Sequence, residues 1–156
     1  MASFGIVMGH YYEDFEVGQE HVTRGRTVTE ADIGLFAGLT GDHVELHTNE
    51  EYARHTPFGS RVAHGLLTLG ISSGLVTQMN LVNDTVLAFY GIDKLRFTKP
   101  VYPGDTIHVK KRVVDVLSKS PEAGVVAFET NVFNQRNELV LIYRDKLMIR
   151  RRPAAG

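Results

Sequence analysis

The stretch Val62-Ala-His-Gly-Leu-Leu-Thr-Leu-Gly-Ile-Ser-Ser-Gly-Leu-Val-Thr-Gln-Met79 determines how the rest of this 156-residue chain is expected to fold. No Asp, Glu, Lys or Arg occurs from Val62 to Asn83, and polar residues are interspersed throughout. This composition predicts a helix buried inside a protein rather than a membrane span. Gly65, Gly70 and Gly74 each cost such a helix about 1 kcal/mol relative to Ala. Close approach of a covering sheet is the expected compensation.

The segments around this helix predict an α+β fold. Four later segments are rich in β-branched and aromatic residues and are separated by turn sequences: 87–99, 106–117, 124–134 and 139–150. Before the helix, Thr29 and Asp32 resemble a capping box and predict a helix over 30–39. A further strand is expected between His21 and Val28, and a short helix beginning at Asn49. A long central helix wrapped by a curved antiparallel sheet of about five strands is therefore expected.

Composition narrows the class of protein. The formal net charge is −1 and there are no cysteines, which excludes disulfides and thiolate chemistry. The length predicts one domain over residues 1–156, with a core at about 13–149. The chain start lacks the pattern of a signal peptide, so a cytoplasmic protein without a membrane partner is expected. No broad basic field predicts nucleic-acid binding, and Arg150–Arg152 is expected to be a short solvated end.

Asp42 and His47 are the first candidate pair for chemistry. Five helical steps turn a side chain by about 500°, so on one straight helix the two side chains would lie roughly 140° apart. A bend between them is required if they act together in proton transfer. The alternative is that Asp42 caps the following segment and that His47 is a surface histidine.

The same segment offers a set of metal ligands. His43, His47 and Glu51 are spaced i, i+4 and i+8, which on a continuous helix would present them on one face. Gly41 before them and Asn49 among them oppose a continuous helix. No metal is therefore expected.

His64 and Gly65 precede the long uncharged helix. A lone histidine in this position is most often a packed imidazole. Gly65, however, would present an unpaired backbone N–H at a helix start, with the helix dipole behind it. Such a donor can stabilise an oxygen that gains negative charge, and the missing side chain allows close approach.

Three blocks together resemble the MaoC-like, R-specific enoyl-CoA hydratases, also called the hydratase-2 family. The first is Phe36-Ala-Gly-Leu-Thr-Gly-Asp42, followed by His47 and Ala53, which resembles an aromatic residue, Thr/Ser-Gly-Asp-x-Asn-Pro-x-His, then five residues and a small one. The others are Phe58-Gly-x-x-Val-Ala-His-Gly65 and Lys99-Pro-Val-Tyr-Pro-Gly-Asp-Thr106. The resemblance covers most of residues 13–149 and implies the hotdog fold. This chain departs from it at Val44-Glu45, where the family has Asn-Pro.

The resemblance implies reversible syn hydration of a 2-enoyl-CoA to a 3-hydroxyacyl-CoA. Asp42 and His47 would hold one water, and the N–H of Gly65 would polarise the thioester carbonyl. The remaining roles are substrate contact by Ala63 and His64, support of the carboxylate by Ser73, and specificity at His43, Val44 and Glu45. Coenzyme A would enter as part of the substrate, with no separate cofactor.

Further expectations concern partners and alternatives. The family dimerises through its sheet, so a homodimer or a dimer of dimers is expected. The cations available for the CoA phosphates are Arg54, Arg61, Arg96 and Lys99. Two other functions stay open at this point: a hotdog acyl-CoA thioesterase, and a non-catalytic acyl-CoA-binding or assembly subunit.

Overall fold

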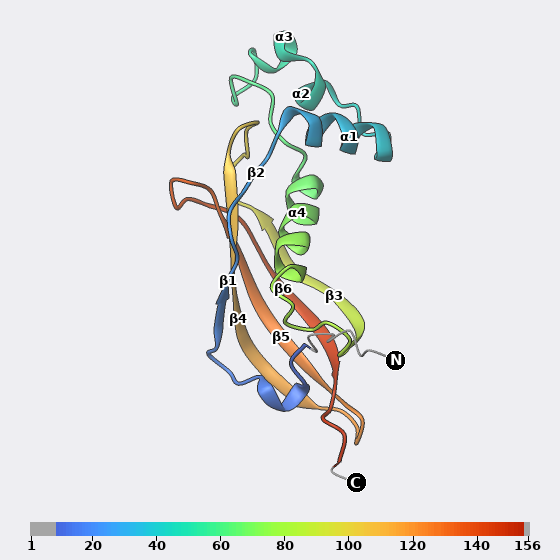
Figure 1. Cartoon of the computed structure of the whole chain (residues 1–156). Coiled ribbons are helices and arrows are strands. Elements are labelled where there is room, and N and C mark those ends of the chain that lie inside the picture. The colour runs from blue at the N-terminus through green and yellow to red at the C-terminus, as the bar shows by residue number, and fades with distance from the viewer. Residues whose placement is uncertain (1–8, 155–156) are drawn as a thin grey trace, which may run out of the picture.

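A computed structural model describes residues 9–154, and Figure 1 shows a long helix lying against the concave side of a curved sheet. The helices are η1 (Tyr12–Asp14), α1 (Glu30–Thr40), α2 (Glu45–Thr48), α3 (Glu50–Ala53) and α4 (Gly65–Thr77). The strands are β1 (Glu20–Val22), β2 (Arg26–Thr27), β3 (Val86–Phe97), β4 (Thr106–Ser118), β5 (Ala123–Phe133) and β6 (Leu139–Arg150). The predicted α+β class is confirmed, and the four long strands begin and end within two residues of their predicted bounds.

The sheet is antiparallel, with the strand order β1-β4-β5-β6-β3 and β2 paired to β4. The described residues therefore hold six strands rather than about five. The difference arises because the segment 21–28 forms two short strands separated by three residues. Register shifts in β3 and β4 bend the sheet, since a bulge increases local twist and curvature. This curvature creates the concave face that receives α4.

Alternating residues on the concave face of the sheet form the core with α4. Ile107, Val109 and Val132 are fully buried in the same cluster as Leu67 and Leu75 of α4. Full burial of each such side chain contributes about 1.5–3 kcal/mol. The packing fixes where the N-terminus of α4 lies relative to the strands, and this end of the helix carries the site.

Helix α1 ends where the candidate acid begins. Thr29 accepts a hydrogen bond from the Asp32 N–H, and the Asp32 carboxylate accepts one from the Thr29 N–H, which confirms the predicted capping box. At the other end, Gly41 adopts a left-handed conformation with φ 79° and donates its N–H to the Ala37 carbonyl. The chain therefore turns away from the helix axis immediately before Asp42.

Helix α4 begins at Gly65, three residues later than predicted. Residues 62–64 are not helical because the backbone of Val62 and Ala63 bonds to other segments, with the Ala63 N–H donating to the Val101 carbonyl at 2.7 Å. The prediction of close approach is wrong at Gly70 and Gly74, where an added Cβ would meet no atom within 4 Å. Within residues 9–154, no helix is long and apolar enough to cross a membrane.

The basic C-terminal segment is exposed at Arg150 and Arg152, as predicted, but Arg151 and Arg152 also form ion pairs. Arg151 pairs with Glu13 at 3.0 Å, and Arg152 pairs with Asp14 at 2.6 Å. Arg151 also lies over the ring of Tyr12, 4.5 Å from its centroid. These two guanidinium groups hold η1 against the end of β6.

Candidate active site

A cavity of about 420 Å³ opens beside the N-terminus of α4. Its wall is mostly apolar, and Lys99 is the only Asp, Glu, Lys or Arg among the lining residues. The lining residues are His47, Phe58, Val62, Ala63, Gly65, Leu66, Thr68, Phe97, Thr98, Lys99, Pro100, Val101 and Val140. Three of the predicted site residues, His47, Ala63 and Gly65, therefore face the same space.

Asp42 is held by the turn that follows α1. Its N–H donates to Thr40 Oγ1 at 3.2 Å, and Thr40 in turn donates to the Phe36 carbonyl. One carboxylate oxygen, Oδ1, accepts the Val44 N–H at 3.4 Å. The second oxygen is thus left to interact with substrate or water.

His47 is fixed in one tautomer by the backbone. Its Nδ1 lies 2.7 Å from the Val62 carbonyl, and since a carbonyl can only accept, the proton resides on Nδ1. The lone pair is then on Nε2, which is the nitrogen that can act as a base. Helix α2 carries this ring to the wall of the cavity.

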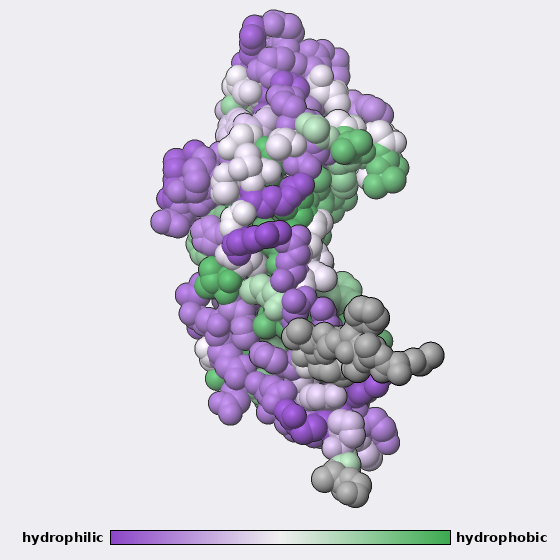
Figure 2. Space-filling model, viewed as in Figure 1, coloured by the Kyte–Doolittle hydropathy of each residue, from purple (hydrophilic) through white to green (hydrophobic). Residues whose placement is uncertain are grey.

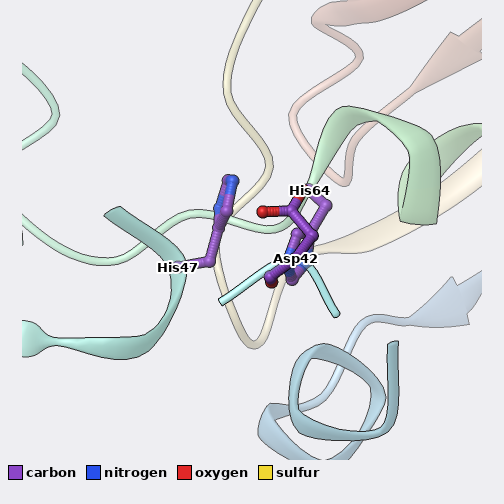
Figure 3. A group of neighbouring side chains, drawn as sticks. All are labelled: Asp42, His47 and His64. Atoms are coloured by element: carbon purple, nitrogen blue, oxygen red, sulfur yellow. The ribbon is translucent and has the colours of Figure 1, made fainter. Parts of the chain in front are cut away.

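The predicted bend between the two residues is present. Residues 41–44 are not helical, and α2 begins only at Glu45. Figure 3 shows the Asp42 carboxylate pointing toward the His47 ring, and the ligand atoms of the two side chains lie within 4.8 Å of each other. This separation suits two groups that share one water molecule.

His64 contacts both Asp42 and His47 without lining the cavity. It is 2% exposed and does not line the cavity, so the structure places it away from the predicted substrate contact. Its Nε2 donates to the Asp42 carbonyl at 3.0 Å, and its ring lies against that of His47, with centroids 4.0 Å apart and planes tilted by 31°. Phe36 covers the other side at 4.7 Å. His64 therefore holds both members of the pair in position.

The trio Asp42, His47 and His64 places three ligand atoms within 4.8 Å of one another, as a metal site would. The imidazole planes of His47 and His64 are tilted by 31°, with their centroids 4.0 Å apart. One nitrogen of each ring donates to a backbone carbonyl, His47 Nδ1 to Val62 and His64 Nε2 to Asp42, so only the other nitrogen of each ring has a free lone pair. The absence of a metal from this trio stays a prediction.

The alternative metal set predicted from spacing is not assembled. His43 precedes α2, His47 lies on α2, and Glu51 lies on α3. Because α2 ends at Thr48 and α3 begins at Glu50, the three side chains do not share a helix face.

Gly65 is the first residue of α4, so its N–H has no acceptor within the helix. Ala63 and Gly65 both line the cavity beside His47. A Cβ built on Gly65 would lie 2.8 Å from two ring carbons of Phe97, which covers this position from β3. Sequence reasoning missed Phe97, because only the tertiary fold brings the end of β3 to the start of α4.

Replacement of Gly65 by Ala is expected to lower activity without lowering stability. The added methyl meets the end of a half-exposed Phe97 ring that can shift outward, and Ala favours the helix by about 1 kcal/mol. The methyl and the displaced ring crowd the N–H donor, so kcat/KM is expected to fall by about 10²-fold. Urea unfolding measures the effect on stability, and kcat/KM on an active substrate measures the effect on activity. An unchanged kcat/KM in Gly65→Ala would contradict the role of the Gly65 N–H as a donor to the substrate oxygen.

Comparison with known proteins identifies the family. The family model described as "MaoC like domain" matches residues 14–134. The chain belongs to the MaoC-like dehydratase family.

Two curated relatives support this membership. The chain is 40% identical over 122 residues to the (R)-specific enoyl-CoA hydratase of Rhodospirillum rubrum, covering 78% of this chain and 79% of that protein. It is 42% identical over 100 residues to Protein MaoC of Klebsiella aerogenes, covering 64% of this chain. That match spans only 29% of the longer Klebsiella protein.

Solved structures agree with the fold. The MaoC-like dehydratase of Rhodospirillum rubrum superposes with a TM-score of 0.85 at 31% identity, covering 93% of this chain and 99% of that chain. A Mycobacterium tuberculosis protein described as a double hotdog fold superposes with a TM-score of 0.83 at 22% identity, covering 95% of this chain and 46% of that one. The predicted hotdog fold is confirmed.

This chain departs from the MaoC-like signature at Val44-Glu45, and the structure shows how these two residues fit where the family has Asn-Pro. Glu45 occupies the first position of α2, where proline is also well tolerated and an acid is favourable. Its carboxylate accepts from Asn49 Nδ2 at 3.1 Å. His43, Val44 and Glu45 do not line the cavity, so none of these predicted specificity residues contacts the space beside His47.

Val44 is a weak N-cap, which gives a direct test of this departure. It is 57% exposed and provides no side-chain hydrogen bond to α2. Val44→Asn is expected to stabilise the fold by about 1 kcal/mol, because its amide oxygen can accept an N–H of the first turn. Thermal unfolding measures the gain, and Val44→Ala, which cannot cap, is the control. Equal stabilities of the Asn and Ala variants would contradict the expectation.

The remaining predicted residues lie apart from the pair. Ser73 is on the exposed side of α4, and its recorded bond is through its carbonyl, which accepts from Thr77. Among residues 9–154, the Ser73 hydroxyl therefore makes no hydrogen bond to Asp42, in contrast to its predicted support of that carboxylate. Among the four candidate cations, Lys99 alone lines the cavity, and it pairs with Glu138 at 2.6 Å.

Proposed function

We propose that this protein catalyses the reversible syn addition of water to a 2-enoyl-CoA, giving a 3-hydroxyacyl-CoA, with the stereochemistry of the R-specific hydratases. The observation that carries the proposal is the placement of His47, with its free Nε2, and of the first residue of α4 on one mostly apolar cavity. Asp42 does not line this cavity itself, but its carboxylate lies within 4.8 Å of a ring nitrogen of His47. The named relatives of the same family, a hydratase and dehydratases at about 40% identity, support the same reaction class.

In the proposed reaction, one water lies between Asp42 and His47. His47 Nε2 takes a proton from this water as its oxygen bonds to C3, and the electron pair of the 2,3 double bond moves toward the thioester carbonyl. The Gly65 N–H stabilises the negative charge on that oxygen, assisted by the dipole of α4. The pair then delivers a proton to C2 on the same face. Both side chains end in their starting protonation states, so the cycle repeats.

The cavity lining suggests which part of the substrate enters it. Its wall is mostly apolar, and Lys99 is its only Lys, Arg, Asp or Glu, so an uncharged acyl chain is the proposed occupant. Lys99 is the proposed first contact for the phosphate-bearing part of coenzyme A. No cofactor besides the substrate's own coenzyme A is proposed.

A chromatographic screen of enoyl-CoAs and 3-hydroxyacyl-CoAs in water tests this proposal. The expected result is interconversion of one enoyl/hydroxyacyl pair, with the R enantiomer as product and no free thiol released. Release of free CoA from a saturated acyl-CoA would indicate a thioesterase instead. Saturable binding without turnover across the panel would indicate a non-catalytic subunit.

We further propose that the protein forms a homodimer that covers β3 and the outer face of α1 and α4. Figure 2 shows apolar surface in the hollow beside these helices. The large exposed apolar residues on these elements are Leu35, Leu39, Leu66, Val86, Leu87, Phe89, Tyr90 and Phe97. β3 is also a long edge strand, which proteins normally cover. Sedimentation equilibrium should give a mass twice the chain's 17.4 kDa, whereas the single-chain mass would contradict the proposal.

A further inference from the structure

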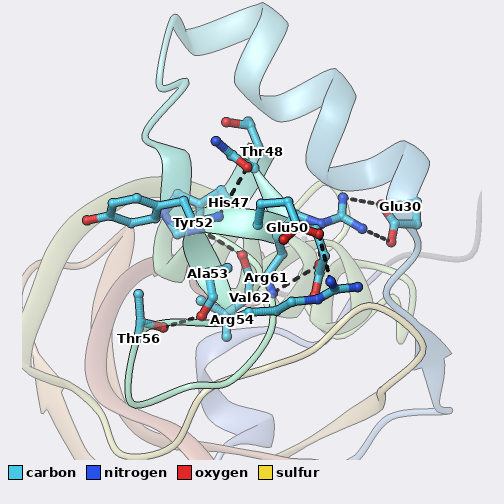
Figure 4. A network of polar contacts seen from close by, with 12 residues as sticks. Glu30, His47, Thr48, Glu50, Tyr52, Ala53, Arg54, Thr56, Arg61 and Val62 are labelled. Atoms are coloured by element: carbon cyan, nitrogen blue, oxygen red, sulfur yellow. Dashed lines mark hydrogen bonds and ion pairs between the residues drawn. The ribbon is translucent and has the colours of Figure 1, made fainter.

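The side chain of Arg61 ties together three segments that surround the site (Figure 4). Its Nη1 and Nη2 donate to both carboxylate oxygens of Glu30, at 2.7 and 2.8 Å. Its Nε donates to Glu50 Oε2 at 2.7 Å. Glu30 is the first residue of α1 and Glu50 the first of α3, so one guanidinium joins two helix starts to the segment that leads into α4.

This network uses the planar geometry of arginine. The fork of two Nη atoms grips one carboxylate while Nε points to another, which an ammonium group cannot reproduce. The hydrogen bond from Arg61 holds the pKa of Glu50 below its usual value, and Glu30 and Glu50 raise the pKa of Arg61. The Arg61 side chain is only 25% exposed, so its pairs are less screened by solvent than ordinary surface pairs.

The network comes close to the ring of His47 through the residue that follows Arg61. Val62 presents the carbonyl that accepts the His47 Nδ1–H at 2.7 Å. On its C-terminal side, this carbonyl is restrained by the N–H of the same peptide, that of Ala63, which donates to the Val101 carbonyl at 2.7 Å. On its N-terminal side, the Arg61 N–H and the Val62 N–H make only long bonds, both 3.4 Å, so the Arg61 side chain makes the shortest bonds there.

We propose that Arg61 is a positioning residue that holds the Val62 carbonyl against His47 and so keeps the imidazole proton on Nδ1. Loss of the guanidinium leaves the 62–63 peptide, which carries this carbonyl, held from outside the site only at its Ala63 end, by the bond to Val101. The carbonyl can then turn away from His47, whose proton can reside on either nitrogen. A ring protonated on Nε2 cannot accept a proton from water at that atom.

The test compares Arg61→Met and Arg61→Lys with the wild-type chain. ¹⁵N NMR of the His47 ring, assigned by its absence in His47→Gln, is expected to show one Nδ1–H tautomer in the wild type and a mixture in both variants. On the active enoyl-CoA, kcat is expected to fall about tenfold or more with KM changed less than about twofold. The matched control is Arg112→Met on β4, which removes an exposed pair with Glu129 at 3.5 Å.

The two readouts keep this proposal separate from the proposed function. The kinetic part rests on hydratase activity, whereas the tautomer is measured on the protein alone. An unchanged His47 tautomer in folded Arg61→Met overturns the positioning role, even where stability falls. If Arg61→Met does not fold, Arg61→Lys and Glu50→Gln decide the same question, since each weakens one side of the network. A wild-type tautomer in both of those variants would equally overturn it.

Discussion

Asp42→Asn is expected to lower the rate of hydration by about 10²–10⁴-fold while leaving the fold intact. Asn keeps an oxygen for the Val44 N–H and a similar volume, so the turn after α1 is preserved. It removes the negative charge and one acceptor for the water shared with His47. Initial rates on the enoyl-CoA found active in the screen, with circular dichroism for the fold, measure the effect.

His47→Gln is expected to lose activity by a similar factor, because no base remains at the Nε2 position. The side chain is half-buried and its single recorded hydrogen bond is to Val62, so the amide can still occupy the site. His55→Gln is the matched control, since His55 is exposed and bonds only the Glu51 carbonyl. Near-wild-type turnover in either Asp42→Asn or His47→Gln would refute the proposed mechanism.

A second large effect is expected at a buried ion pair under the sheet's concave face. Lys111 on β4 is 3% exposed, and its Nζ donates to both oxygens of Asp145 on β6, at 2.7 and 2.6 Å. Thr130 on β5 bonds both partners. Burial lowers the pKa of Lys111, and the neighbouring Asp145 opposes that shift. The pair is therefore an integral part of the core.

Lys111→Met is expected to destabilise the protein by about 3–5 kcal/mol, because it leaves the Asp145 carboxylate buried without its cation. This is a large share of the roughly 5–15 kcal/mol by which such domains are stable. The free energy of unfolding in urea measures the loss. In the double variant Lys111→Met/Asp145→Leu, both charges are gone, and most of the stability is expected to return.

The exposed pair between Lys146 and Asp93 is the control for this experiment. Its atoms are 3.6 Å apart and its side chains are 51% and 63% exposed. Lys146→Met is expected to change the free energy of unfolding by less than about 1 kcal/mol. A loss below that value in Lys111→Met would show that the buried pair is dispensable.

Local sequence determined the elements and the motif. The Thr29–Asp32 capping box and Gly41 set the ends of α1 through bonds within one turn, so they could be predicted without knowledge of the fold. The long strands followed from β-branched residues between turn sequences, and the order of helices and strands predicted the α+β arrangement. The need for a bend between Asp42 and His47 followed from helix geometry alone.

Tertiary structure decided what each residue of the motif does. It moved the start of α4 to Gly65, because backbone groups of Val62 and Ala63 bond to His47 and Val101 instead of continuing a helix. It placed Ser73 on an exposed side and left Gly70 and Gly74 uncovered within the chain. These outcomes depend on contacts between distant segments, whose energies no local pattern encodes.

The segment from Val62 to Met79 shows the same division between what the sequence and the tertiary structure determined. Its lack of charge indicated that it would be buried, and its sequence placed Gly65 beside a histidine near the start of the predicted helix. Only the packed structure turned His64 inward onto Asp42 and His47, brought Phe97 over Gly65, and joined Arg61 to Glu30 and Glu50. The physical reason is that composition decides whether a segment leaves water, whereas the partners that it meets there depend on how the whole chain folds.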